Sequence, residues 1–184
     1  IFDVAQHPRG FVLMANNYGL LSYDGVSWRL MPLGPSTVAL SVAIGPDGRM
    51  FAGGSRTFGE VIEDPTGQLF YQPFESQLPV ADRAFSDIWQ TFVAPGGTAY
   101  FRSRERIISL QAGEARSLSP KGRFSAAGMA KGVLYAHDTE VGLIAVGSAQ
   151  AEAVPGGEAF RRLPVTAIAE GSEGTLLIGT QDRG

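Results

Sequence analysis

Three arginines alternate with other residues in the middle of the sequence, at Arg102, Arg104 and Arg106. If this stretch is a β-strand, side chains two residues apart lie on one face, so the three guanidinium groups point the same way. A planar guanidinium forks onto paired oxygens, and such a face could therefore bind an anion or a sugar. Glu105 and Glu114 offer the alternative, in which they screen the arginines along a solvated strand edge.

Aromatic and imidazole side chains add further candidates. Trp89 precedes the arginines, and its ring could stack on a sugar or pack between elements of the core. His137 opens the run HDTE at 137–140, which we interpret as a polar turn, because no second cluster completes a metal coordination shell. His7 lies in a turn before Pro8 and is interpreted as a solvated loop residue.

No residue pattern predicts catalysis. The sequence has only two histidines, and no serine sits in the glycine frame of a nucleophile elbow. Glu63 and Asp64 are adjacent, so on a strand they point to opposite faces and cannot flank one glycosidic bond. The absence of cysteine excludes disulfides, zinc fingers, iron–sulfur clusters and thiol nucleophiles. We therefore expect no catalytic residue, no metal and no cofactor.

The composition indicates a folded chain of short strands. With 24 glycines and 11 prolines among 184 residues, turns must be frequent, which suits strands better than long helices. Hydrophobic residues make up 44 %, enough for a sizeable core. The net charge of −3 and the absence of a basic stripe argue against nucleic-acid binding. No apolar run approaches the roughly 18 residues of a membrane helix, and no signal peptide opens the sequence.

One pattern occurs five times along the chain: an apolar strand, a turn that ends in an anchor glycine, and a second apolar strand. The anchor glycines recur at intervals of 35 to 49 residues, which is the period of a β-propeller blade. Four of the five segments carry alanine five residues before the anchor, as crowding near a propeller axis favours. The anchors are Gly10, Gly48, Gly97, Gly132 and Gly174.

Third and fourth strands follow in the first four units. The fourth strands are predicted at 28–32, 69–74, 115–120 and 158–164, and the chain ends at Gly184, where the third strand of unit five would begin. The predicted fold is therefore all-β: a partial β-propeller with four four-stranded antiparallel blades plus two strands of a fifth. We expect a single domain, 1–184, with blade units at about 1–34, 38–76, 85–120, 124–164 and 165–184.

Comparison of the units singles out two residues at the end of the second strand. This position is Ala15, Gly53 or Gly179 in three units, but Arg102 and His137 in units three and four. Large polar side chains on neighbouring blades could face one ligand from adjacent sides, and the alternative is that these blades have simply drifted. We therefore predict a ligand-binding site at Arg102, His137, Arg104 and Trp89.

The residues resemble a known family. The runs that carry the resemblance are NNYGLLSYDGVSWRLMPL at 16–33, SVAIGPDGRMFAGG at 41–54 and LPVADRAFSDIWQTFVAPGGTAYFRSRERIISL at 78–110. They resemble the ligand-binding sensor propellers of bacterial two-component regulator propeller proteins. The resemblance covers most of 1–110, weakens over 111–165 and returns at 165–180.

The resemblance implies a role and a location. In that family a periplasmic propeller precedes a triple-tyrosine β-sandwich domain, a transmembrane helix and a cytoplasmic output module such as a histidine kinase. The expected function is thus an extracytoplasmic sensor module of a transmembrane receptor, not itself an enzyme. Its ligand would be an unknown small molecule, with carbohydrates among the candidates, and contact with the membrane would come only through downstream segments.

Two other functions remain open, and one expectation concerns assembly. A propeller-scaffold enzyme of the polysaccharide lyase or lactonase type would gather several His, Asp or Arg at its central channel. A protein-interaction propeller of the kelch or WD type is the other alternative, although the WD dipeptide is missing. Four and a half blades leave apolar faces and strand edges uncovered, so we expect self-association.

Overall fold

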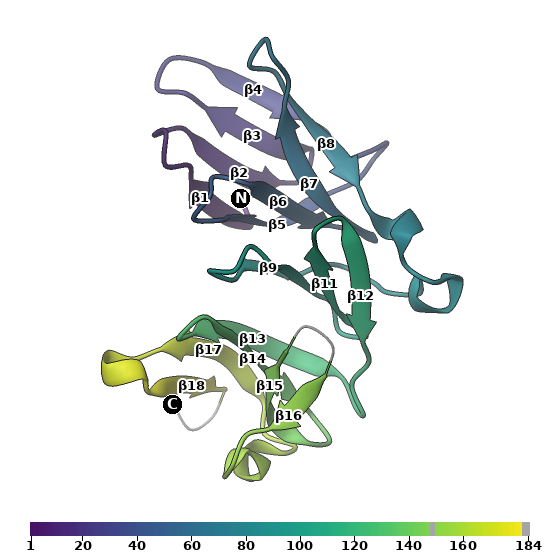
Figure 1. Ribbon diagram of the computed structural model, residues 1–184, viewed down its shortest axis with the longest axis vertical. Coiled ribbons are helices and arrows are strands. Elements are labelled where there is room, and N and C mark those ends of the chain that lie inside the picture. Colours follow the sequence, from purple (N-terminus) through teal and green to yellow (C-terminus); the bar gives the residue numbers. More distant parts are fainter. Residues whose placement is uncertain (148–149, 182–184) are drawn as a thin grey trace.

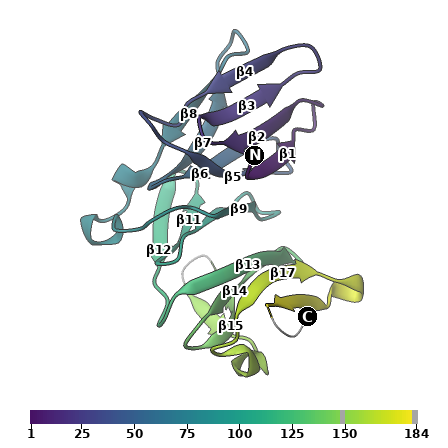
Figure 2. The ribbon, with the colours of Figure 1, turned by 180° about the vertical axis from the view of Figure 1, so that it is seen from behind.

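The structure is a computed structural model that describes residues 1–147 and 150–181. Its strands form five separate antiparallel sheets, each made from one continuous stretch of chain. Figures 1 and 2 show these sheets following one another along the molecule in chain order, with the N-terminal sheet at one end and the two-stranded sheet at the other. The described residues contain four short 3₁₀ segments and no α-helix.

Each of the first four sheets is a blade of four strands in sequence order. Blade 1 comprises β1 (Asp3–Gln6), β2 (Val12–Asn16), β3 (Gly19–Tyr23) and β4 (Trp28–Met31). Blade 2 comprises β5 (Ala39–Ile44), β6 (Met50–Gly54), β7 (Thr57–Glu63) and β8 (Leu69–Pro73). Blade 3 comprises β9 (Gln90–Val93), β10 (Ala99–Arg102), β11 (Ile107–Gln111) and β12 (Glu114–Leu118). Blade 4 comprises β13 (Phe124–Ala130), β14 (Val133–Asp138), β15 (Gly142–Val146) and β16 (Ala151–Ala153).

A half-blade completes the described chain. It pairs β17 (Val165–Glu170) with β18 (Leu176–Thr180). The inner strands β1, β5, β9, β13 and β17 contact one another in succession. The prediction of four four-stranded blades plus two strands of a fifth is thereby confirmed, while the end of the fifth unit, 182–184, lies outside the described residues.

The anchor glycines explain the regular turns between the first and second strands. All five have positive φ, between +73° and +99°, a backbone conformation that glycine adopts without the steric cost of a Cβ. At three of the anchors the glycine amide donates to the carbonyl oxygen three residues earlier, as Gly10 N does to His7 O and Gly48 N to Gly45 O. The glycine spacing in the sequence thus marks real turns in the fold.

Apolar side chains fill the spaces between successive blades. Between blades 1 and 2, Leu13 and Leu20 pack in one buried cluster with Met50 and Val61. Between blades 2 and 3 the cluster is aromatic, with the ring centroids of Phe58 and Phe101 5.0 Å apart. The core is therefore a series of inter-blade layers.

One predicted strand is wrong. The fourth strand of unit four was expected at 158–164, but the chain pairs earlier, at Ala151–Ala153. Residues Gly157–Phe160 instead form a 3₁₀ turn, η3, that packs against β15. Pro155 and Gly156, the latter at φ +77°, end the strand and redirect the chain, so the apolar residues beyond them cover the blade without joining the sheet.

A glycine substitution tests how closely the last two inner strands approach. A Cβ on Gly128 would overlap the carbonyl oxygen of Ile168, so we expect Gly128→Ala to lower the free energy of unfolding by about 2 kcal/mol. Gly96→Ala is the matched control, because that position has no neighbouring atom within 4 Å. Urea unfolding measures both, and equal midpoints for the two variants would contradict this inter-blade packing.

Candidate functional site

A polar side chain in the inner strand of each complete blade reaches the backbone of the next blade. It stands seven residues before the anchor glycine in every case, and we call these four positions the latch residues. The hydrogen bonds measure 3.0 to 3.1 Å. Asp3 accepts from Val42 N, Ser41 donates to Ile88 O, Gln90 bonds both N and O of Ala127, and Ser125 donates to Val165 O.

Arg102 supports the latch between blades 3 and 4. Its Nε donates to the Oε1 of Gln90 at 2.7 Å, and its Nη1 donates to Phe124 O at 3.2 Å. The residue is only 7 % exposed, and none of the ion pairs of the described residues includes it. Burial, together with the nearby Arg104, lowers the pKa of Arg102 to about 10, so the guanidinium stays charged at pH 7. A buried cation without a carboxylate partner is therefore present here.

The three arginines do not share one strand face, and that prediction is wrong. Strand β10 ends at Arg102, and the hydroxyl of Ser103 accepts from Arg106 N at 2.9 Å to form a tight turn. Arg104 is exposed, whereas Arg106 pairs with Asp82 at 3.1 Å. The turn breaks the alternation on which the shared face depended.

His137 has the corresponding place between blade 4 and the half-blade. Its Nδ1 lies 2.7 Å from the hydroxyl of the latch residue Ser125, and its Nε2 lies 2.8 Å from Phe160 O. The side chain is completely buried. The two residues that replace a small side chain, Arg102 and His137, therefore each contact the latch residue of their own blade.

Trp89 lies next to Arg102 through the backbone, since its amide donates to Arg102 O at 2.9 Å. It is 42 % exposed, so part of the indole faces solvent. Arg102, Arg104 and Trp89 thus lie at one end of blade 3, while His137 serves the next blade boundary. The structure does not bring all four around one cavity, and their role in ligand binding stays a prediction.

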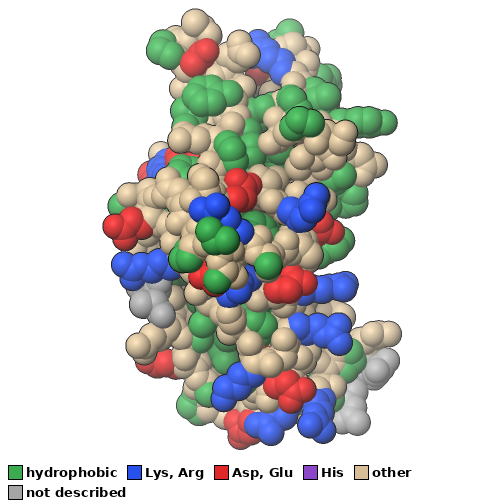
Figure 3. Space-filling model, turned by 90° about the vertical axis from the view of Figure 1, so that its right-hand side faces the viewer, with side chains coloured by type: hydrophobic (Ala, Val, Ile, Leu, Met, Phe, Trp, Pro, Cys, Tyr) green, Lys and Arg blue, Asp and Glu red, His purple; other side chains and the backbone are tan. Residues whose placement is uncertain are grey.

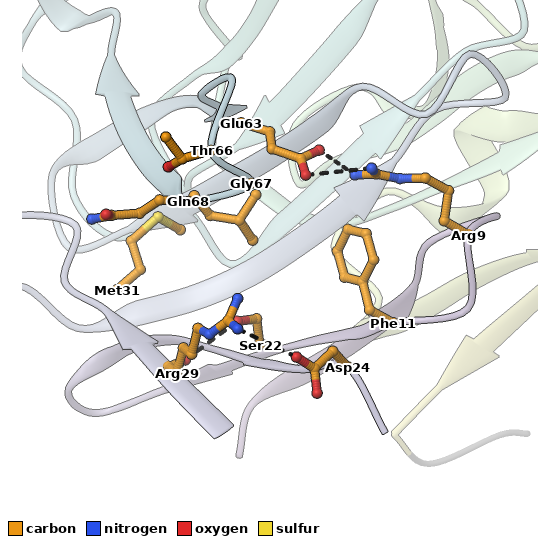
Figure 4. Close-up of a pocket in the computed structure, with 11 residues that line it drawn as sticks. Arg9, Phe11, Ser22, Asp24, Arg29, Met31, Glu63, Thr66, Gly67 and Gln68 are labelled. Carbon is orange, nitrogen blue, oxygen red and sulfur yellow. Dashed lines mark hydrogen bonds and ion pairs between the residues drawn. The ribbon is translucent and has the colours of Figure 1, made fainter. Parts of the chain in front are cut away.

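A hollow that sequence reasoning missed opens between blades 1 and 2 (Figure 4). Its volume is about 510 Å³. Blade 1 contributes Arg9, Phe11, Ser22, Asp24, Arg29 and Met31, and blade 2 contributes Glu63, Leu69 and the hairpin 66–68. We call it the blade 1–2 cleft. Its walls come from two segments, 9–31 and 63–69, that are more than thirty residues apart in the sequence, so only the fold reveals it.

Ion pairs cross and line this cleft. Arg9 on blade 1 forms a two-point ion pair with Glu63 on blade 2, and its guanidinium lies 5.3 Å from the Phe11 ring centroid. Arg29 lies 3.5 Å from Asp24. His7 is buried beside the cleft, contrary to its interpretation as a solvated residue: Nε2 donates to Gly48 O, and Nδ1 accepts from Arg9 N.

The aspartates near the cleft organise turns, as their positions before glycines suggested. Asp24 Oδ1 accepts from the amides of Val26 and Ser27, and Oδ2 accepts from the Ser27 hydroxyl. These hydrogen bonds, with a smaller contribution from Arg29, lower the pKa of Asp24 to about 2. Asp64 similarly accepts from Thr66 and Gln68.

Comparisons with known proteins show the fold. No family model matches the sequence, and no curated protein is significantly similar to it. Virginiamycin B lyase from Staphylococcus aureus is 14 % identical with a TM-score of 0.70, over 96 % of this chain and 62 % of the lyase chain.

The similar structures also include extracellular domains of proposed one- and two-component systems. One is the extracellular domain of a proposed one-component system from B. thetaiotaomicron: 13 % identical, TM-score 0.65, 97 % of this chain and 26 % of that chain. Another is the extracellular domain of a proposed hybrid two-component system from the same organism. It is 12 % identical with a TM-score of 0.55, and the match covers 96 % of this chain and 32 % of that chain. The resemblance inferred from the sequence therefore finds structural counterparts. This chain spans less than two thirds of the lyase and about a third or less of the two extracellular domains.

No helix in the described part of the chain is long and apolar enough to cross a membrane. Within the same residues, no three His, Cys, Asp or Glu side chains gather as a metal site would require.

The latch between blades 3 and 4 predicts a large effect on stability. Gln90→Leu would leave Ala127 N, Ala127 O and the Nε of Arg102 without a partner, so we expect a loss of about 2–4 kcal/mol in the free energy of unfolding. Gln72→Leu, at an exposed position of β8, should change it by less than about 0.5 kcal/mol. If the two variants unfold at the same urea concentration, the latch does not stabilise the fold.

The hydrogen bonds of the Asp24 turn predict a carboxylate that stays ionised at unusually low pH. Because its folded pKa of about 2 lies below the ordinary value of 3.8, ionised Asp24 favours the folded turn above about pH 4. This contribution disappears as the pH falls through about 2. Carboxyl ¹³C NMR should show a midpoint near pH 2, in a signal that Asp24→Asn removes. A midpoint near pH 4 would show that the turn hydrogen bonds are absent in solution.

Proposed function

We propose that this chain belongs to an extracytoplasmic, ligand-binding sensor propeller of a bacterial transmembrane signalling receptor. The observation that carries the proposal is the agreement of two independent likenesses. The sequence over most of 1–110 resembles two-component regulator propellers, and the fold is similar to extracellular domains of proposed one- and two-component systems. In this role the propeller binds ligand, and segments outside this sequence carry the signal across the inner membrane.

The electrostatics at the end of blade 3 support a ligand with an anionic group. Arg102 is a buried guanidinium whose partners are uncharged oxygens, and Arg104 adds a second positive charge beside it. A bound anion would offset the repulsion between the positive charges of Arg102 and Arg104. The exposed part of Trp89 offers an apolar surface nearby. A carbohydrate that bears a carboxylate has both features.

Signalling would follow from differential binding. A ligand shifts the receptor between two states only by the difference of its affinities for them. Binding across the boundary of blades 3 and 4 would favour one relative placement of these blades, because Gln90 and Arg102 already join them. The output module would read that placement.

An enzyme on the same scaffold is the second candidate, because the fold is also similar to virginiamycin B lyase. Two features disfavour it. His137 is completely buried between Ser125 and Phe160, and His7 bonds backbone atoms through both ring nitrogens. Neither imidazole can reach a substrate, so a catalytic histidine would have to come from outside this sequence.

Surface charge agrees with a small-molecule ligand rather than a nucleic acid. On the face shown in Figure 3, acidic and basic side chains are intermixed over the middle and lower parts, and hydrophobic side chains gather toward the end formed by blades 1 and 2. Nucleic-acid binders need a continuous basic surface. A protein-interaction propeller and self-association stay predictions, and the exposed Val4 and Leu30 on the outer face of blade 1 support the latter.

A ligand screen that begins with acidic and neutral oligosaccharides tests this function. Because both side chains are exposed, Arg104→Ala and Trp89→Ala should keep the melting temperature yet weaken a ligand bound by the parent at least about fivefold, roughly 1 kcal/mol. Lys131→Ala removes an exposed charge elsewhere on blade 4 and serves as control. A ligand whose affinity stays within about twofold in both variants would place the site elsewhere. A screen without any ligand would argue against a sensor.

A further inference from the structure

Arg29 lines the blade 1–2 cleft with a guanidinium that has few hydrogen-bond partners. The side chain is 66 % exposed, and its guanidinium contacts one group, the Oδ2 of Asp24 at 3.5 Å. That carboxylate already accepts hydrogen bonds from Val26 and Ser27. A guanidinium has five N–H donors in a fork that suits a carboxylate. Most of the donors of Arg29 are therefore available to a ligand.

Glu63 offers the complementary charge from blade 2. Its two oxygens each accept one hydrogen bond from Arg9, although a carboxylate has about four acceptor positions. Gly67 stands beside it without a side chain, and a Cβ there would lie only 3.7 Å from Oε1 of Glu63. Lone pairs of Glu63 thus remain open toward the cleft, where an ammonium could reach them.

The balance of charge defines the ligand class. The four charged residues of the cleft, Arg9, Arg29, Asp24 and Glu63, sum to zero. A ligand with only negative charge would meet the two carboxylates, and a ligand with only positive charge would meet the two arginines. A dipolar molecule can place each end against an opposite charge.

Apolar side chains complete the cleft. Phe11, Met31 and Leu69 line it between the charged groups, and all three are at least half buried. The volume of about 510 Å³ lies within the usual range of small-ligand sites. The space therefore suits a compact molecule with an apolar body between two charged ends.

We propose that the blade 1–2 cleft binds a short apolar peptide through its free ends. The terminal carboxylate binds the Arg29 fork and the hydroxyl of Ser22, which also lines the cleft (Figure 4). The terminal ammonium binds Glu63 and leaves the ion pair with Arg9 in place. This site is separate from the one at blade 3, and the proposal does not depend on the receptor role.

Calorimetric titration of the full chain with leucyl-leucine tests the proposal. We expect Arg29→Gln and Glu63→Gln each to weaken binding by about tenfold or more, because each removes one charge partner of the peptide. The matched controls are Arg116→Gln and Glu114→Gln, which break a similarly exposed 3.5 Å pair on blade 3. These should leave the affinity unchanged.

Capped peptides separate the dipolar ligand from other classes. The N-acetylated and C-amidated forms of leucyl-leucine each lose one charge, and both should bind about tenfold more weakly than the free peptide. NMR shifts of the backbone amides should place the bound peptide at residues 22 and 67, which also keeps the test informative if a variant unfolds. Equal binding of the three peptides, shifts confined to other blades, or no binding at millimolar peptide would overturn the proposal.

Discussion

The hydrogen bond from an inner-strand side chain to the backbone of the next blade is the constraint on which this structure depends. In the described residues no named strand of one blade pairs with a strand of another, and backbone contact between blades is limited to isolated points such as the bridge between Ser55 and Asp87. Apolar layers press the blades together, but apolar contact is non-directional and does not fix register. The latch residues Asp3, Ser41, Gln90 and Ser125 add direction, because each bonds a defined backbone group of its neighbour, and Gln90 bonds two.

The latches also explain the sequence departures at Arg102 and His137. Gln90 projects farther than a serine or an aspartate, and its Oε1 accepts from Arg102 as well as from Ala127. His137 contacts the hydroxyl of Ser125 and joins it to Phe160 of the 3₁₀ turn η3. A large polar residue among small equivalents thus indicates a local need for hydrogen bonding. For Arg102, a positive charge beyond that need remains, because both of its partners are uncharged.

The fold was predictable from the sequence where the signal is local. Each anchor glycine fixes a turn through its own φ, so the five units could be aligned without contacts between them. The prediction that the three arginines share one strand face was wrong, because β10 ends at the turn that Ser103 forms. The strand predicted at 158–164 is absent, because the residues after Gly156 form a 3₁₀ turn. The cleft could not be predicted, since Arg9 and Glu63 meet only after two blades have packed.

Blades 1 and 2 are held together by buried contacts at their inner strands, and toward the outside the cleft separates them. At the inner strands the amide of Val42 donates to Asp3, in the layer that buries Leu13 and Leu20. Toward the outside the exposed Arg9–Glu63 ion pair crosses the cleft, and such pairs contribute little to stability. If the two blades move, rotation about the inner edge changes the width of the cleft and keeps the hydrogen bond between Asp3 and Val42. A ligand held by Arg29 on one wall and Glu63 on the other would then favour one width, so a small molecule could bias the relative orientation of two otherwise rigid sheets.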